Sequence, residues 1–192
     1  MTLSNRAVAL ILSIFVFIGV QSAPYALIAQ TETQAQALDR LFSQLQEAGE
    51  DDWQDVEKMI WAEWSRSGSK SMDYLLERGR AEMKEGNYAV AINHFSALID
   101  HAPDFAEGWN ARATAFFAAD RFGLSIADIR QTLLLEPRHF GALAGLGMIY
   151  ERLDQPEAAL RAYEEVAKVH PNRPDAKEAI ERLKVKLEGE AL

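Results

Sequence analysis

Cysteine is absent from the 192 residues of this sequence, and proline and glycine are scarce, at 6 and 11. The lack of cysteine excludes disulfides, thiolate metal sites, cysteine nucleophiles and the lipid-modified cysteine of a bacterial lipoprotein. The scarcity of proline and glycine excludes a chain made mainly of linkers. Cations are the minority, with 20 Lys and Arg against 29 Asp and Glu. The net charge of −9 repels phosphate backbones, so we expect no nucleic-acid partner.

Sequence motifs of the common catalytic sites are also missing. The chain has no glycine-rich phosphate loop, no Gly-x-Ser-x-Gly elbow and no His-Glu-x-x-His. The four histidines lack the spacing of metal ligands, and we expect turn and surface positions for them: His94, His101, His139 and His170. The many acidic residues fall on predicted solvent faces. These observations predict a protein without catalytic activity, metal or cofactor.

One long apolar run is present, from Ala7 to Val20, and Arg6 is the sole charge before Glu32. This profile is typical of a secretory signal peptide, because a membrane-spanning helix needs about 20 apolar residues. We expect residues 1–29 to be removed after Ala29 and the body to be exported to the periplasm of a Gram-negative bacterium. In the alternative, residues 7–29 remain as an inner-membrane anchor, which would be the only contact with a membrane.

The full sequence has 48% apolar and 26% charged residues, the balance of a globular protein, and the part after the N-terminal segment repeats itself. Pro103, Pro137 and Pro171 follow one another at intervals of 34 residues. Several columns agree in the same register, with small residues in some and large apolar residues in others. The columns are Leu75, Trp109 and Leu143; Gly79, Ala113 and Gly147; Ala91, Ser125 and Ala159; Phe95, Ile129 and Tyr163.

This pattern resembles the tetratricopeptide repeat (TPR), a 34-residue pair of antiparallel helices that ends in proline. The resemblance implies an all-α fold, a right-handed α-solenoid with units at 72–105, 106–139 and 140–173. Pairs of small residues, such as Gly79 with Ala91 and Gly147 with Ala159, would let the two helices of a unit approach closely.

Amphipathic helices are predicted on both sides of the units. Residues 30–70 form a helical hairpin that we interpret as a divergent repeat or cap, with Trp61 and Trp64 packed on the apolar face of the first unit. In the alternative, the two tryptophans are an exposed anchor for a partner. Residues 174–192 form a C-terminal capping helix and tail.

In the TPR family the first helix of each unit lines the concave surface, which implies candidate residues for partner binding. They are Leu76, Arg80, Met83, Asn110, Thr114, Phe117, Met148 and Arg152. Members that grip a C-terminal carboxylate need lysine and asparagine where this chain has Leu76 and Arg80, so that activity is not expected here. The groove instead suits an extended or helical segment with apolar anchors. In the alternative, its apolar residues belong to the core.

The predicted function is therefore a protein-protein interaction scaffold that holds a peptide or helix of another protein in the concave groove. A function of another class stays open, in which the chain is a structural subunit that self-associates as a homo-oligomer through open repeat faces.

Overall fold

The computed structural model describes residues 32–49 and 51–190, and every regular element within these ranges is a helix. The predicted signal peptide or anchor lies outside the described residues and stays a prediction. Within the described ranges, no helix combines the length and the apolar character needed to cross a bilayer.

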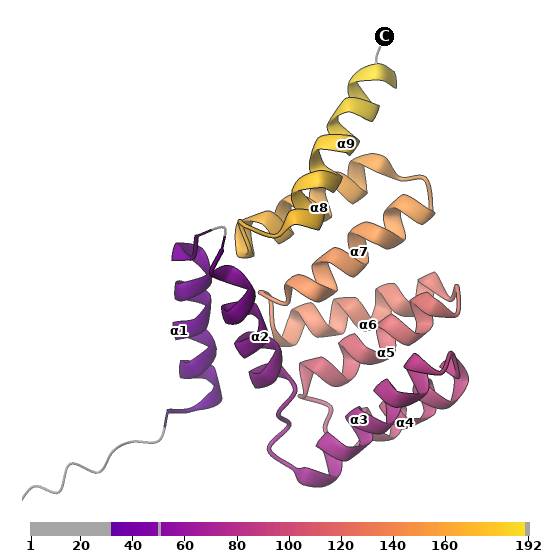
Figure 1. The fold of residues 1–192 in the computed structure, drawn as a ribbon. Coiled ribbons are helices and arrows are strands. Elements are labelled where there is room, and N and C mark those ends of the chain that lie inside the picture. The colour runs from indigo at the N-terminus through magenta and orange to yellow at the C-terminus, as the bar shows by residue number, and fades with distance from the viewer. Residues whose placement is uncertain (1–31, 50, 191–192) are drawn as a thin grey trace, which may run out of the picture. The chain divides into compact units, whose positions relative to one another are not determined.

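Three antiparallel helix pairs are stacked on one another (Figure 1). They are α3 (Lys70–Lys84) with α4 (Tyr88–His101), α5 (Ala106–Ala118) with α6 (Phe122–Leu135), and α7 (Phe140–Arg152) with α8 (Pro156–Val169). A last helix, α9 (Pro174–Glu190), packs on α8. The predicted all-α solenoid is confirmed.

The same turn joins the two helices of every pair. Its central residue has a positive φ, at 76° for Gly86, 54° for Asp120 and 52° for Asp154. The next residue donates its backbone N–H to a carbonyl five residues back, as in the 2.8 Å bond from Arg121 to Phe116. Glycine adopts this left-handed conformation without strain and aspartate tolerates it, so the sequence fixes the reversal at the same place in each unit.

Small residues allow close packing within each pair, and the side chains nearest to Gly79 and Gly147 are aromatic rings. A Cβ added to Gly79 would lie 2.2 Å from the Phe95 ring, and one added to Gly147 would lie 2.8 Å from the Tyr163 ring. In the middle unit, Ala113 shares a core cluster with Ile129. A glycine therefore faces an aromatic ring and an alanine faces an aliphatic side chain, which keeps the volume of each pair nearly constant.

The N-terminal hairpin consists of α1 (Gln34–Glu47) and α2 (Trp53–Trp64). Thr33 opens α1 with a capping box, in which its hydroxyl accepts from the Gln36 N–H and its own N–H donates to the Gln36 side chain. The buried face of α1 contributes Leu38, Leu41, Phe42 and Leu45 to a core cluster.

This hairpin does not pack on the apolar face of the first unit as predicted. Its core cluster joins residues of α7, α8 and α9. Gln46 Nε2 donates to the carbonyl oxygens of Lys168 and Val169 at 2.9 and 2.8 Å, and Asn172 Nδ2 donates to the Ala48 carbonyl at 2.7 Å. In Figure 1 the hairpin lies beside the stack, along the ends of its helices. The turns that join successive units contact the hairpin through two histidines. His139 stacks on Trp64, and His170 lies beside Glu57.

Candidate functional site

A cavity of about 190 Å³ opens between α5 and α7, on the side of the stack predicted to be concave. Most of its wall is made of small or apolar side chains, together with Asn110, Thr114 and the Arg173–Asp175 pair. Its small lining residues are Ala113, Gly141, Ala142, Ala144 and Gly145. An apolar cavity of about 150 Å³ is large enough to take benzene, so this one has room for one large apolar side chain.

Four of the eight predicted groove residues line this cavity: Asn110, Thr114, Phe117 and Met148. Met148 is 47% exposed, although it is a large apolar residue. Phe117 is half-buried and contacts the Phe122 ring, with centroids 5.7 Å apart. The Thr114 hydroxyl donates to the Asn110 carbonyl at 3.0 Å.

The other four predicted residues lie outside the cavity. Leu76 is 1% exposed in the core between α3 and α4, and Met83 packs against the same cluster, so the core alternative applies to both. Arg152 pairs with Asp120 at 3.5 Å, with its side chain 61% exposed. Arg80 donates to Ser65 Oγ at 3.1 Å and pairs with Glu107.

Glu107 is the centre of a buried polar network beside the cavity, and it is 3% exposed. It accepts from Arg80, from Asn110 Nδ2 at 2.9 Å and from the His139 ring at 3.0 Å. The Ala142 N–H donates to His139 Nδ1 at 3.1 Å, which leaves Nε2 to carry the proton that His139 donates to Glu107. Burial raises the pKa of Glu107, but the His139 bond and the Arg80 charge outweigh burial and hold this pKa below its usual value.

Two sequence expectations were therefore wrong. His139 and His170 are fully buried rather than at the surface. Glu107 and Asp128 are also buried rather than on solvent faces, and Asp128 pairs with Arg112 Nε at 2.7 Å. Their partners come from other helices or from the hairpin, so the periodicity of one helix could not show them.

The tryptophans of α2 pack beside the cavity, Trp61 on Gly141 of its wall and Trp64 on His139. The Trp64 ring stacks on His139, with centroids 4.0 Å apart and planes at 7°. A Cβ added to Gly141 would lie 2.6 Å from the Trp61 ring, so glycine is needed where Trp61 crosses α7. Trp64 is 4% exposed, which contradicts an exposed anchor at that residue, and Trp61 is half-buried.

A second histidine-carboxylate contact holds the other end of α2. His170 Nε2 lies 3.2 Å from Glu57 Oε2, and Trp61 Nε1 donates to Glu57 Oε1 at 3.1 Å. Burial raises the pKa of Glu57, and the bonds from His170 and Trp61 with the Arg173 charge bring it below the usual value. Through Glu57, Trp61, Trp64 and Ser65, α2 contacts residues of all three units.

Family comparison agrees with the repeat register. The tetratricopeptide-repeat model matches residues 76–133 and 110–177. The chain belongs to the tetratricopeptide-repeat family. Helical repeats of this family typically bind other proteins and are not catalytic.

Curated relatives include a TPR repeat-containing protein of Rhizobium etli. It is 35% identical over 155 residues, which are 80% of this chain and 76% of the relative. The chloroplastic TPR domain-containing protein PYG7 of Arabidopsis thaliana is 28% identical over 62% of this chain and 41% of its own length.

Solved TPR structures share the fold. The first TPR domain of Spaghetti (RPAP3), bound to an HSP90 peptide, has a TM-score of 0.59 and 25% identity over 62% of this TPR chain and 94% of that domain. The secretion chaperone SycD of Yersinia enterocolitica, in complex with a YopD peptide, has a TM-score of 0.58 over 62% of this chain and 95% of its own; its identity of 14% shows the fold alone.

Proposed function

We propose that this TPR protein is a non-catalytic scaffold that holds a segment of a partner protein in the cavity between α5 and α7. The observation that carries the proposal is the cavity itself, since it has an apolar, small-residue wall and an exposed Met148 at its edge. An exposed methionine at an apolar depression adapts to the shape of an incoming side chain. The first TPR domain of Spaghetti (RPAP3), which has a similar structure, is bound to an HSP90 peptide, and this supports a peptide-binding function.

The chemistry of the wall defines the anchor that the partner must supply. Apolar atoms dominate around Phe117 and Met148, so the anchor is a leucine-sized or aromatic side chain. Asn110 uses its amide N–H on Glu107, and the Thr114 hydroxyl donates to Asn110. The Thr114 oxygen still has acceptor capacity for a backbone N–H of the partner.

The partner segment must end or turn away at α2. Trp61 lies against Gly141, which is also part of the cavity wall, so the hairpin blocks further passage along α7 in that direction. A segment bound here extends instead toward Phe117 and Met148. Glu107, at a unit position that the family register assigns to the groove, is unavailable to a partner because Arg80, Asn110 and His139 surround it.

The location belongs to the proposal as well. We propose that the protein acts in the periplasm after loss of residues 1–29, and the N-terminal sequence pattern is what supports this location. In the alternative, residues 7–29 anchor it to the inner membrane. Both locations leave the groove open to other envelope proteins.

The experiment fills the cavity without disturbing the fold. A Cβ at Gly145 would meet only Ile129 Cδ1, at an ordinary contact distance of 3.6 Å, so Gly145→Leu should place its side chain in the cavity. Gly49→Leu is the matched control, since a Cβ there meets nothing within 4 Å and Gly49 is not part of the cavity. Both variants should keep the melting temperature of the wild type within a few degrees.

The readout is affinity capture from a periplasmic extract, followed by a titration of each captured protein against the three purified forms. We expect a partner that binds the wild type and Gly49→Leu alike and binds Gly145→Leu at least about tenfold more weakly. Equal binding to all three forms would place the partner elsewhere, and capture of nothing would contradict the scaffold function.

A further inference from the structure

The outward face of α6 is apolar and basic although nothing in the described chain covers it. The exposed positions Leu124, Ala127 and Leu134 follow a spacing of three and seven residues, which puts them on one helical face with Arg130. Leu134 is 72% exposed and Leu124 is 43% exposed. This surface, Leu124–Ala127–Arg130–Leu134, is called the α6 stripe below.

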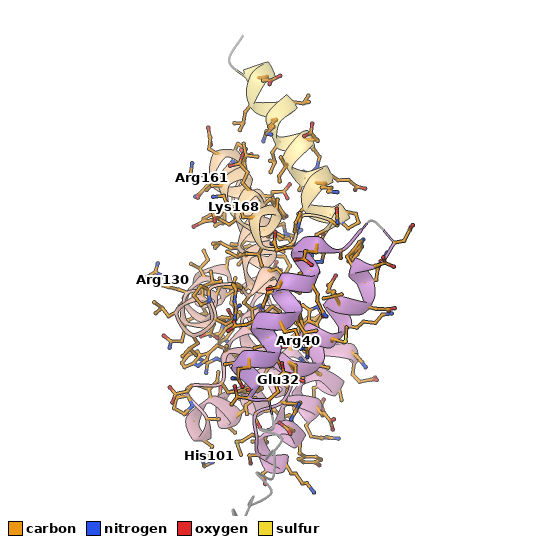
Figure 2. All side chains as sticks on the ribbon, turned by 90° about the vertical axis from the view of Figure 1, so that its left-hand side faces the viewer. Glu32, Arg40, His101, Arg130, Arg161 and Lys168 are labelled. Atoms are coloured by element: carbon orange, nitrogen blue, oxygen red, sulfur yellow. The ribbon has the colours of Figure 1, made fainter. Side chains whose placement is uncertain are left out.

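The α6 stripe lacks a carboxylate of its own. The acidic residue of α6, Asp128, points inward and is paired with Arg112. Arg130 on α6 and Arg161 on α8 are exposed and form no ion pair in the described part of the chain. Figure 2 shows both arginines extending into solvent from the same side of the molecule.

A second cavity lies next to the stripe. Arg130 and Leu134 border a depression of about 250 Å³ that also includes Leu133, Leu146 and Tyr150. It is separate from the groove of the proposed function, apart from Ile129, which contributes to both walls. An apolar side chain of a helix that binds here could therefore enter this depression next to the Arg130 guanidinium.

The opposite pattern occurs on α9. Glu178, Glu181, Val185 and Glu188 share one face at a spacing of three, seven and ten residues, and all four are exposed. Val185 is 69% exposed, and the three glutamates form no ion pair with any residue that the structure describes. The last turns of α9 extend past α7 and α8 in Figure 1. This surface is called the α9 stripe.

We propose that the α9 stripe of one copy of this chain binds the α6 stripe of a second copy. Both stripes run for about 15 Å along their helices, because ten residues of α-helix rise that far. Val185 would enter the depression beside Leu134, and the glutamates on either side of it would face Arg130 and Arg161. The second copy is the occupant because the complementary charge and spacing are on the chain itself.

The two stripes are different surfaces, so the contact is heterologous. The assembly keeps one free stripe at each of its two ends, so it grows as an open chain rather than stopping at a closed dimer. One helix-on-helix contact is at the small end of protein interfaces, so the association should be weak and dependent on concentration. It should also weaken in high salt, since the Debye length falls from about 10 Å at 0.1 M to about 3 Å at 1 M.

The test is sedimentation equilibrium of the full purified chain over a wide concentration range. We expect the average mass of the wild type to rise with concentration, and Arg130→Glu and Glu181→Arg each to shift the rise to at least about tenfold higher concentration. Lys70→Glu is the control, since it reverses a charge at an exposed position of α3, and it should behave as the wild type. A wild type that stays monomeric throughout would overturn the proposal.

A mixing experiment separates this geometry from other forms of self-association. The Arg130→Glu variant retains its α9 stripe, and a Val185→Glu variant retains its α6 stripe. The two altered stripes repel each other because both substitutions add negative charge, so the mixture should form a dimer of one copy each that cannot grow. A mixture that stays monomeric, or grows as the wild type does, contradicts the heterologous contact. Neither outcome depends on the groove, so the result is independent of the proposed function.

Discussion

Gly145 and Gly147 of α7 differ in the space around them, so alanine should have opposite effects on stability at the two positions. A Cβ on Gly147 would lie 2.8 Å from the Tyr163 ring, whereas one on Gly145 would lie 3.6 Å from Ile129 Cδ1. Gly147→Ala should therefore destabilise the protein by about 1–3 kcal/mol through overpacking. Gly145→Ala should stabilise it by about 0.5–1 kcal/mol, because alanine loses less backbone entropy in a helix. Urea unfolding of both variants checks this, and a shared sign of the two changes would contradict it.

The Glu107 carboxylate makes stability depend on pH. Its pKa is lower in the folded state than the usual 4.5 of a glutamate, so its contribution to stability is present above pH 4.5 and is lost as the pH falls through the folded pKa. Glu107→Gln should be destabilised at pH 7, and the gap to the wild type should narrow below pH 4.5. Chemical unfolding at a series of pH values measures the gap. Glu47→Gln, at an exposed carboxylate, is the control and should show no such change.

At the scale of elements, the repeat helices could be predicted from the sequence and the position of the hairpin could not. Turn glycines, turn aspartates and the terminal prolines are local signals, and they recur every 34 residues. The contact between Glu57 and His170 joins residues 113 positions apart, and no periodicity reports such a pair. One signal was available: Gly141 stands in a column where the other two units have Asp73 and Glu107 and α9 has Asp175, and the glycine makes room for Trp61.

The repeat register predicted only part of the cavity lining, because it does not report contacts between units. The family register predicted Asn110, Thr114, Phe117 and Met148 as groove residues, and these four line the cavity. It could not show that Arg80 pairs with a buried carboxylate. Glu107 belongs to the next unit, and the pattern of its own helix predicts a surface position for it.

The position of the hairpin predicts which helices depend on it. Trp64 is buried against His139 and Phe140, so Trp64→Ala should cost about 3–5 kcal/mol. Amide hydrogen exchange should accelerate more in α7, α8 and α9 than in α3 and α4, since the hairpin shares its core with the former. Tyr74→Ala, at a 60% exposed side chain of α3, is the control. Faster exchange confined to α3 and α4 would contradict this packing.

At the scale of the whole molecule, the groove and the α6 stripe should act independently. The two cavities have Ile129 as their one shared lining residue, and Leu124 and Leu134 are exposed on α6, so changes at the two surfaces should have nearly additive effects. We expect Gly145→Leu to leave self-association unchanged and Leu134→Glu to leave partner affinity unchanged, each within about twofold. Sedimentation and titration of the two single variants and the double variant measure this, and a loss of both properties in one single variant would show that the surfaces are coupled.

The course of α2 across the stack has a mechanical consequence. In most solenoids each unit contacts only its neighbours. Such a molecule stretches and bends easily, since every junction between units deforms slightly. Here α2 is fixed near Arg80 at one end and at His170 at the other, with the Trp64–His139 stack between them. A pulling force on the two ends of the stack is therefore carried both by the contacts between units and by α2. The protein should resist extension until α2 detaches and should then lengthen abruptly.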